Sequence, residues 1–356
     1  MTYLDYQATT PLAPEALAAM LPWLESQHAN PHSAHAAGRA AKAAVEVARA
    51  QVAALLPPGG RVAFTSGATE ALNWAIKGTR GSIVTLATEH AAVLDTVAAL
   101  GREATVLPVE HDGIVSERIP GSGAGVVAVM LVNNEIGVIQ PVAAIARAAR
   151  ESGALVLCDA VQGFGRMPIP KGCDMVAISA HKIHGPKGIG ALWVRDGIAL
   201  EPLLHGGGQE VLGRSGTLSP ALCAGFGAAA GLAARRMDED ATHVARLWTA
   251  ARERLGADWT LNGSAEHRYL GNLNIRFPGL DVGRLVSDLR DIAFSAGSAC
   301  ASGSGRPSHV LRAICLSDAE ARSSIRLGFG RYTRRAELLT AIERIDTAAR
   351  AQRIAA

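Results

Sequence analysis

Continuous apolar runs alternate with amphipathic segments along the N-terminal part of the chain. The apolar runs occur at residues 82–86, 104–109, 126–132, 155–158, 175–179 and 191–194. Because most of them are apolar throughout rather than at every second position, they predict strands of a mainly parallel sheet covered on both faces. Amphipathic helices are predicted at residues 14–27, 39–56, 71–77 and 142–151, and some of them would connect the strands in βαβ units.

The pattern changes near Arg235. Residues 220–255 predict a long helix that is broken around the acidic stretch Asp238-Glu239-Asp240. After it we expect strands at 272–277, 292–295 and 325–327, a helix at 282–290 and a C-terminal helix from residue 335. We therefore predict an α/β protein with a large domain at 14–236 and a smaller α+β domain formed by 1–13 and 237–356.

Composition narrows the class of protein. The 356 residues are too many for one small core, and 49% hydrophobic with 19% charged residues gives no sign of disorder. A net charge of +3 gives no electrostatic case for nucleic-acid binding. Residues 1–12 lack the features of a signal peptide, and the uncharged stretch 220–234 is too short to span a membrane. We expect a cytoplasmic protein without membrane or nucleic-acid partners.

Five cysteines are scattered along the chain without a C-x-x-C pair: Cys158, Cys173, Cys223, Cys300 and Cys315. This odd number and wide spacing argue against a disulfide framework or a zinc site and favour a reducing compartment. Cys158 and Cys223 are expected in the core, and Cys173 and Cys315 at the surface.

Polar side chains follow two of the predicted strands. Lys182 lies in the Gly/Pro-rich segment after strand 175–179, and Asp159 follows strand 155–158. Ligands of open α/β sheets bind at the carboxyl ends of the strands. A lysine there can form a Schiff base with a carbonyl cofactor, and an aspartate can pair with the ring nitrogen of a pyridine cofactor. Taken singly, a solvated lysine and a capping or surface aspartate are the more common cases.

Residues 64–70 precede the predicted helix 71–77 and contain Ser66, Gly67 and Thr69. Small and hydroxyl residues at a helix start offer backbone N–H groups and the positive end of the helix dipole to a phosphate, although such residues are usually plain caps. His90, beyond strand 82–86, carries a flat ring that could stack on a cofactor. A single histidine in that place is more often structural or at the surface.

These segments and others resemble, in order and over nearly the whole chain, the motifs of one enzyme family. The matching segments are 3–5, 8–11, 30–33, 64–70, 89–90, 133–137, 159–162, 179–190, 206–210, 214–217, 297–300, 308–311 and 324–326. With them the chain resembles the NifS/IscS-type cysteine desulfurases, which are fold-type I pyridoxal-phosphate enzymes of the class V aminotransferase family. The resemblance implies a mainly parallel seven-stranded sheet covered by helices. Tyr6-Gln7 departs from the Asn-Ala of many relatives, so no role is carried over to these two positions.

The resemblance also implies roles around the cofactor. Lys182 would hold pyridoxal 5'-phosphate as a Schiff base and carry protons, and His90 would stack on the ring and is a candidate acid or base. Asp159 and Gln162 would hold the pyridine nitrogen and the phenolic oxygen side. Asn134 would lie beside the cofactor and the substrate.

Further roles concern the two anionic groups of cofactor and substrate. The phosphate would be bound by Ala68, Thr69, Ser179 and His181. Thr217 would reach the phosphate from a second subunit, so that Thr217 and the loop 206–209 imply a homodimer. Arg326 would bind the carboxylate of the substrate, for which the fork of a guanidinium is suited.

Cys300 lies in the Gly/Ser-rich run 295–305, which has little capacity to form a core and predicts an exposed loop. A cysteine taken at random is more often an inert core residue. In the family that the chain resembles, this thiol takes sulfur from L-cysteine as a persulfide, leaves L-alanine, and delivers the sulfur to an acceptor or scaffold protein for iron–sulfur assembly. We expect no metal site, apart from Cys300 as a transient iron–sulfur ligand.

Three alternatives stay open on the sequence. Another class V aminotransferase and a selenocysteine lyase would use the same scaffold, and an aminotransferase would not need Cys300. A non-catalytic sulfur-relay protein would have a degenerate site, against which the presence of Lys182, Asp159 and Cys300 speaks.

Overall fold

The computed structural model describes residues 1–116, 124–297 and 307–354, so Cys300 lies outside the described residues. Within them the largest sheet has seven strands in the order β2-β8-β7-β6-β5-β3-β4. Its strands are β2 (Gly60–Thr65), β3 (Ser82–Leu86), β4 (Ala104–Leu107), β5 (Ala124–Met130), β6 (Leu155–Asp159), β7 (Met175–Ser179) and β8 (Gly190–Arg195). Strands β4, β3, β5, β6 and β7 are parallel, and β8 is antiparallel to both β7 and β2. The sheet is therefore mainly parallel, as predicted. Strand β2 was not predicted, because it begins with Gly60 and Arg61 rather than with apolar residues.

Helices cover both faces of this sheet, which explains why its strands are apolar throughout. On one face, Val127 and Val129 of β5 share a core with residues of α1 (Pro14–Glu25), α2 (Ala36–Ala53) and α5 (Val142–Glu151). On the other face, Val126 and Ala128 of the same strand pack with α3 (Ala68–Lys77) and α4 (Ala91–Leu100). Successive residues of a strand point to opposite faces, so each strand supplies both cores.

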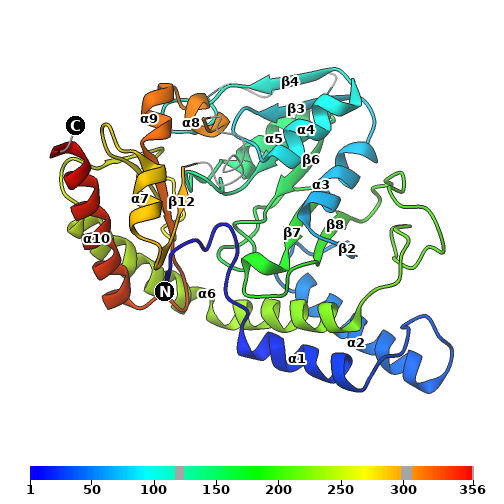
Figure 1. Ribbon diagram of the computed structural model, residues 1–356. Coiled ribbons are helices and arrows are strands. Elements are labelled where there is room, and N and C mark those ends of the chain that lie inside the picture. Colours follow the sequence, from blue (N-terminus) through cyan, green and yellow to red (C-terminus); the bar gives the residue numbers. More distant parts are fainter. Residues whose placement is uncertain (117–123, 298–306, 355–356) are drawn as a thin grey trace.

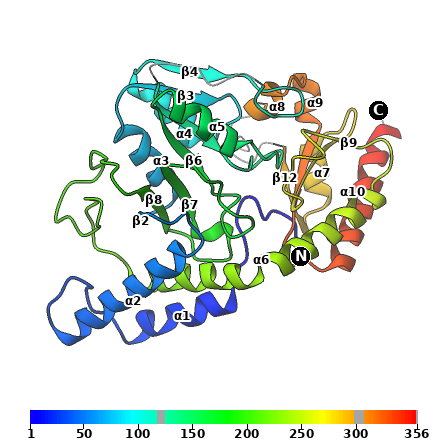
Figure 2. The same cartoon turned by 180° about the vertical axis from the view of Figure 1, so that it is seen from behind.

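One helix connects the two parts of the molecule. α6 (Pro220–Arg254) is continuous over 35 residues, so the predicted break at Asp238-Glu239-Asp240 was wrong. No proline or glycine follows Gly231 within the helix, and the acidic residues lie where α6 crosses from one core to the other. Figures 1 and 2 show α6 along the base of the molecule, with α1 and α2 packed against its first half.

The C-terminal part forms a small antiparallel sheet in the order β12-β13-β10-β9. Its strands are β9 (Thr260–Leu261), β10 (Asn272–Arg276), β12 (Ser295–Ala296) and β13 (Ser324–Gly328). The surrounding helices are α7 (Val282–Asp288), α8 (His309–Ala313), α9 (Asp318–Arg322) and α10 (Arg335–Ile354). The single strand predicted at 292–295 is instead two short ones, because β11 (Ile292–Ala293) pairs with β1 (Thr2–Tyr3) whereas β12 pairs with β13.

The segment of residues 5–10, which we call the N-terminal strap, crosses between the two sheets. Asp5 forms a bridge to Gly328 at the end of β13. At the other end of the strap, the Thr10 N–H donates to the carbonyl oxygen of His181 at 2.9 Å. The strap thereby places the first residues of the chain over the carboxyl end of β7.

The cysteines correct one prediction. Cys158 and Cys223 are fully buried and Cys315 is exposed, as predicted. Cys173 was expected at the surface but is 2% exposed, because it lies just before β7 and packs in the core of the large sheet. Among the described residues, no group of three or more His, Cys, Asp or Glu could hold a metal ion, and no helix is long and apolar enough to cross a bilayer.

Candidate active site

A cavity of about 580 Å³ opens at the carboxyl ends of the central strands. Most of the residues singled out in the sequence line it: Ala68, Thr69, His90, Asn134, Asp159, Gln162, Ser179, His181, Lys182 and Arg326. Thr217 is exposed and is not among the lining residues, and Cys300 lies outside the described part of the chain. The fold thus brings together side chains that are up to 258 residues apart in the sequence, between Ala68 and Arg326.

Lys182 ends the short 3-10 helix η1 (Ala180–Lys182), directly after β7. Its Nζ donates to the main-chain carbonyl oxygens of Gln7 at 2.6 Å and Ala8 at 2.8 Å. These contacts hold the amine within the cavity and place it under the N-terminal strap. The sequence motif around Ala8 was recognised, but nothing in the sequence indicated that its carbonyl groups would hold the lysine.

Asp159 is the last residue of β6, on the strand next to β7, and is 3% exposed. One carboxylate oxygen accepts the Val161 N–H at 3.0 Å. Burial raises the pKa of the Asp159 carboxyl, while the nearby His90 and Lys182 favour its charged form. A buried carboxyl of this kind is suited to a cationic partner inside the cavity.

His90 is the N-cap residue of α4, and its Nδ1 accepts the Ala92 N–H at 3.0 Å. Because Nδ1 is an acceptor, the neutral ring carries its proton on Nε2. Burial lowers the pKa of His90, with Asp159 opposing this effect and Lys182 reinforcing it. The preceding Glu89 is fully buried, and burial holds the pKa of its carboxyl well above the usual range. Burial therefore favours the uncharged forms of both the His90 ring and the Glu89 carboxyl.

The part of the cavity at the start of α3 offers groups suited to an anion. Gly67 caps α3 with an extended backbone, so the first N–H groups of that helix are at the cavity wall beside Ala68 and Thr69. Burial, followed by the charge of Lys182, lowers the pKa of His181 to about 4, so its ring is neutral. His181 Nδ1 lies 3.2 Å from the Thr9 hydroxyl oxygen.

The Glu70 carboxylate does not oppose an anion at this helix end, because it is held on other groups. It accepts from Arg214 Nε at 2.8 Å and from the Ser66 N–H at 2.7 Å. These bonds lower the pKa of Glu70 against the opposing effect of its burial. The same ion pair joins the start of α3 to the segment that carries Thr217.

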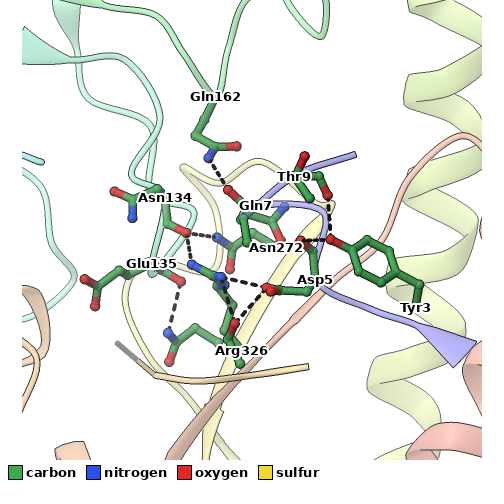
Figure 3. A network of polar contacts seen from close by, with 12 residues as sticks. Tyr3, Asp5, Gln7, Thr9, Asn134, Glu135, Gln162, Asn272 and Arg326 are labelled. Atoms are coloured by element: carbon green, nitrogen blue, oxygen red, sulfur yellow. Dashed lines mark hydrogen bonds and ion pairs between the residues drawn. The ribbon is translucent and has the colours of Figure 1, made fainter. Parts of the chain in front are cut away.

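Both the nitrogen and the oxygen of the Gln162 side-chain amide form hydrogen bonds within the protein. Its Nε2 donates to the Gln7 carbonyl oxygen at 2.9 Å, and its Oε1 accepts from Arg166 at 2.8 Å. The Gln7 carbonyl oxygen therefore accepts from Gln162 (Figure 3) and also from Lys182 Nζ. The contact expected between Gln162 and the phenolic oxygen side of the cofactor stays a prediction.

Arg326 lies on β13 with its side chain only 1% exposed, and it reaches the cavity from the small sheet. Its guanidinium donates to the Asn134 carbonyl oxygen at 2.9 Å and to Asp5 Oδ1 at 2.8 Å. Asn272 Nδ2 also donates to the Asn134 carbonyl (Figure 3). Asp5 was part of a recognised motif but had been given no role, because its partner is 321 residues away.

These features fit pyridoxal 5'-phosphate. The cavity contains an amine for its aldehyde, a buried carboxyl for its pyridine nitrogen, a flat ring at His90, and a helix N-terminus for its phosphate. The two strand ends that carry Lys182 and Asp159 are adjacent, since Asp159 pairs with Ala177 of β7.

Comparisons with known proteins agree with this description. The model of the aminotransferase class-V family matches residues 2–340. Cysteine desulfurase IscS of Rickettsia bellii is 42% identical over 96% of this chain and 90% of that protein. A NifS-like protein from Rickettsia africae has a structure with a TM-score of 0.89 and 30% identity, covering 98% of this chain and 99% of that one. A structure titled SspA in complex with cysteine has a TM-score of 0.82 and 33% identity, covering 94% and 100% of the two chains.

The chain belongs to the aminotransferase class-V family. The predicted fold class is confirmed, and so is the cofactor, because enzymes of this family depend on pyridoxal 5'-phosphate. The roles of individual residues stay predictions.

Proposed function

We propose that this protein is a cysteine desulfurase that converts L-cysteine to L-alanine and takes the sulfur as a persulfide on Cys300. The observation that carries the proposal is one cavity in which Lys182, the buried Asp159 and Arg326 meet. The Cβ–S bond of L-cysteine breaks, and an S–S bond to Cys300 forms. Since alanine plus a persulfide contains the same atoms as cysteine plus a thiol, the step consumes no external oxidant or reductant.

The described residues divide the work of binding and proton transfer. Bound pyridoxal phosphate supplies an electron sink for the Cα carbon of the substrate. Lys182 holds the cofactor and moves the proton at Cα, and its place under the strap keeps the amine inside the cavity. Asp159 would pair with the pyridine nitrogen and favour its protonated form. His90 donates from Nε2, because its Nδ1 is already an acceptor.

Anion binding divides the site between two ends. Ala68, Thr69, Ser179 and His181 bind the phosphate at the start of α3, and Arg326 with Asn134 binds the substrate. Amide groups at a helix start and neutral donors suit a phosphate, while a guanidinium suits a carboxylate. Since Lys182 and Arg326 line the same cavity, an amino acid bound at Arg326 would share that cavity with the Lys182 amine.

The active form is a homodimer in which Thr217 of each chain completes the phosphate site of the partner. In support, Thr217 is exposed and separate from the cavity of its own chain. Helix α1 also exposes an apolar stripe of Leu17, Leu21 and Leu24, at the i, i+4, i+7 spacing of one helix face.

The sulfur on Cys300 passes to a thiol of an acceptor or scaffold protein that serves iron–sulfur cluster assembly. Cys300 is also a transient ligand of the iron–sulfur cluster during this transfer. The relatives named cysteine desulfurase IscS support this destination. The compartment is the cytoplasm, since the cysteines of the described residues are free thiols, as in a reducing environment.

The chain divides into a large domain at 14–236 and a small domain of 1–13 and 237–356. Support comes from α6, which contributes Ala230 and Leu232 to the core of the large sheet and Val244 and Leu247 to that of the small sheet.

The deciding experiment compares Cys300→Ser with Cys315→Ser, whose thiol is exposed elsewhere. We expect both variants to keep the absorbance of the lysine-bound cofactor. Only Cys300→Ser should lose sulfide release and alanine formation from L-cysteine, because a serine hydroxyl cannot accept sulfur as a thiolate does. Mass spectrometry of the unaltered protein after turnover should find one extra sulfur on the Cys300 peptide. Unchanged sulfide release by Cys300→Ser would refute the proposal.

A further inference from the structure

Arg326 already has a carboxylate partner before any substrate arrives. Arg326 Nη2 lies 2.8 Å from Asp5 Oδ1, and among the described residues this is the only ion pair of Arg326. The side chains are 1% and 20% exposed, so the pair is largely shielded from water. A guanidinium in this position is both the substrate's proposed partner and the partner of Asp5.

Counting its donors shows what Arg326 can still offer. One Nη1 hydrogen goes to the Asn134 carbonyl, and Nη2 donates to both Asp5 Oδ1 and the Ser295 hydroxyl oxygen at 3.2 Å. A guanidinium has five N–H groups. Its Nε is buried and has no partner among the described residues. Among the described residues, Nε–H and one Nη1 hydrogen are therefore left without a partner, on a cation whose charge is already balanced by Asp5.

Asp5 is held beside Arg326 by hydrogen bonds to both its side chain and its main chain. Ser295 lies opposite Arg326 in the β12–β13 ladder, and its hydroxyl donates to Asp5 Oδ1 at 2.8 Å. The Tyr3 hydroxyl donates to the carbonyl oxygens of Asp5 at 3.2 Å and Thr9 at 2.9 Å, which fixes the turn of the strap (Figure 3). The backbone of Asp5 is thereby fixed, and its carboxylate is held by Ser295 and Arg326.

We propose that Asp5 is a resident counter-ion that weakens the binding of the α-carboxylate at Arg326. This inference rests on the proposed function in one respect, namely that Arg326 receives that carboxylate. While the site is empty, Asp5 neutralises the buried guanidinium. When an amino acid binds, two carboxylates share one cation and repel each other, so affinity is lower than an unpaired arginine would give. The weaker binding applies equally to the product alanine, which has the same α-carboxylate and must leave.

The test titrates the holoenzyme with L-alanine and follows the absorbance of the cofactor. Ethylamine, which is alanine without its carboxylate, serves as the matched ligand. Asp5→Asn keeps the shape and an acceptor oxygen but removes the charge, and Asp5→Ser removes the charge with a smaller side chain, in case the first variant does not fold. Asp288→Asn is the control, because it removes the carboxylate of an exposed ion pair with Arg284, outside the cavity.

We expect the half-saturating concentration of L-alanine to fall about tenfold in both Asp5 variants, as removal of a nearby like charge from a shielded site predicts. It should stay within about twofold in Asp288→Asn, because the charge lost there is exposed and screened by water. Ethylamine should bind equally to all four proteins. A merely structural role of Asp5 would weaken both ligands, so unchanged or weaker alanine binding, or an equal shift for ethylamine, would overturn the inference.

The titration is separate from sulfur release. Sulfide release that persists in Cys300→Ser would overturn the proposed function and leave the alanine titration valid. Equal half-saturation by alanine and ethylamine in the unaltered protein would overturn the role of Arg326 and this inference together. A carboxylate effect that is present in the unaltered protein but unchanged in the Asp5 variants would overturn this inference alone.

Discussion

At the scale of single residues, the protonation of Asp159 depends on its burial and on the neighbouring His90 and Lys182. It is buried at a strand end, where burial raises the pKa of its carboxyl. Asp159→Asn keeps the size of the side chain but cannot stabilise a protonated pyridine nitrogen. We expect alanine formation from L-cysteine to fall on the order of hundredfold or more, with the cofactor still bound to Lys182, because an electrostatic partner of the reacting group is lost.

The matched control for this prediction is Asp174→Asn. Asp174 is also buried and precedes the neighbouring strand, but it pairs with Arg195 and does not line the cavity. Its replacement should lower stability rather than turnover per folded molecule. Steady-state rates together with the cofactor absorbance check both variants, and equal activity of Asp159→Asn and the unaltered protein would contradict the assignment.

His184 predicts a dependence of stability on pH. The residue is 7% exposed, Nδ1 donates to the Pro11 carbonyl at 2.9 Å, and burial lowers the pKa of His184 to about 4. The unfolded chain takes up the proton near pH 6.5, so the contribution to stability is complete above that pH and is lost as pH falls towards 4. We expect the unaltered protein to lose about 2 kcal/mol through this residue between pH 7 and pH 5.

The variant for this prediction is His184→Asn, since His184 has a φ of 69° and asparagine tolerates that region. Urea unfolding at pH 7 and pH 5 should show a smaller loss of stability in the variant, by about 2 kcal/mol. His28→Asn, at an exposed position, should behave like the unaltered protein. An identical loss in His184→Asn would rule out the histidine as the cause.

The sequence predicts those site residues that follow an apolar run along the chain. Lys182 and Asp159 could be assigned because each follows a recognisable strand, and parallel strands bring their carboxyl ends together. Asp5 could not be assigned, since its contact with Arg326 depends on how β13 meets the strap. The burial of Cys173 was missed for a similar reason: it lies outside any apolar run, and only the packing of the sheet encloses it.

At the scale of elements, α6 shows where a sequence pattern misleads. The run of acidic residues suggested a break in the helix, yet the helix propensities of Asp and Glu do not exclude them from a helix interior. The ion pair of Asp240 with Arg331 attaches the helix to the segment after β13. The Arg331 side chain is 3% exposed, so Asp240→Asn leaves a buried cation without its counter-ion. We expect the free energy of unfolding to fall by about 3 kcal/mol.

Glu239→Gln is the matched control for Asp240→Asn. Glu239 is the next residue towards the N-terminus and pairs with Arg236 on the exposed face of α6, where its side chain is 68% exposed. Its loss should cost less than about 1 kcal/mol. Urea unfolding curves of both variants decide the question, and equal midpoints would show that the buried pair does not stabilise the junction of the two cores.

At the scale of the whole molecule, the exposed apolar face of α1 predicts self-association. Leu21→Glu would place a charge in the middle of the stripe formed with Leu17 and Leu24. If this face is buried between two chains, the charge loses its water and the dimer dissociates. Sedimentation should then give a monomer. Val286→Glu, at another exposed apolar residue, should leave the dimer intact.

Shared sites give a stricter test than mass, because they concern which chain supplies each residue. Lys182→Ala removes the amine of a site, and Thr217→Asp puts a carboxylate against the phosphate of the partner's site. Each variant alone should be inactive. In a mixed dimer one site combines an intact Lys182 with an intact Thr217 from the other chain, so about half of the normal activity should return. If differently tagged, co-purified mixed dimers stay inactive, Thr217 does not act across the interface.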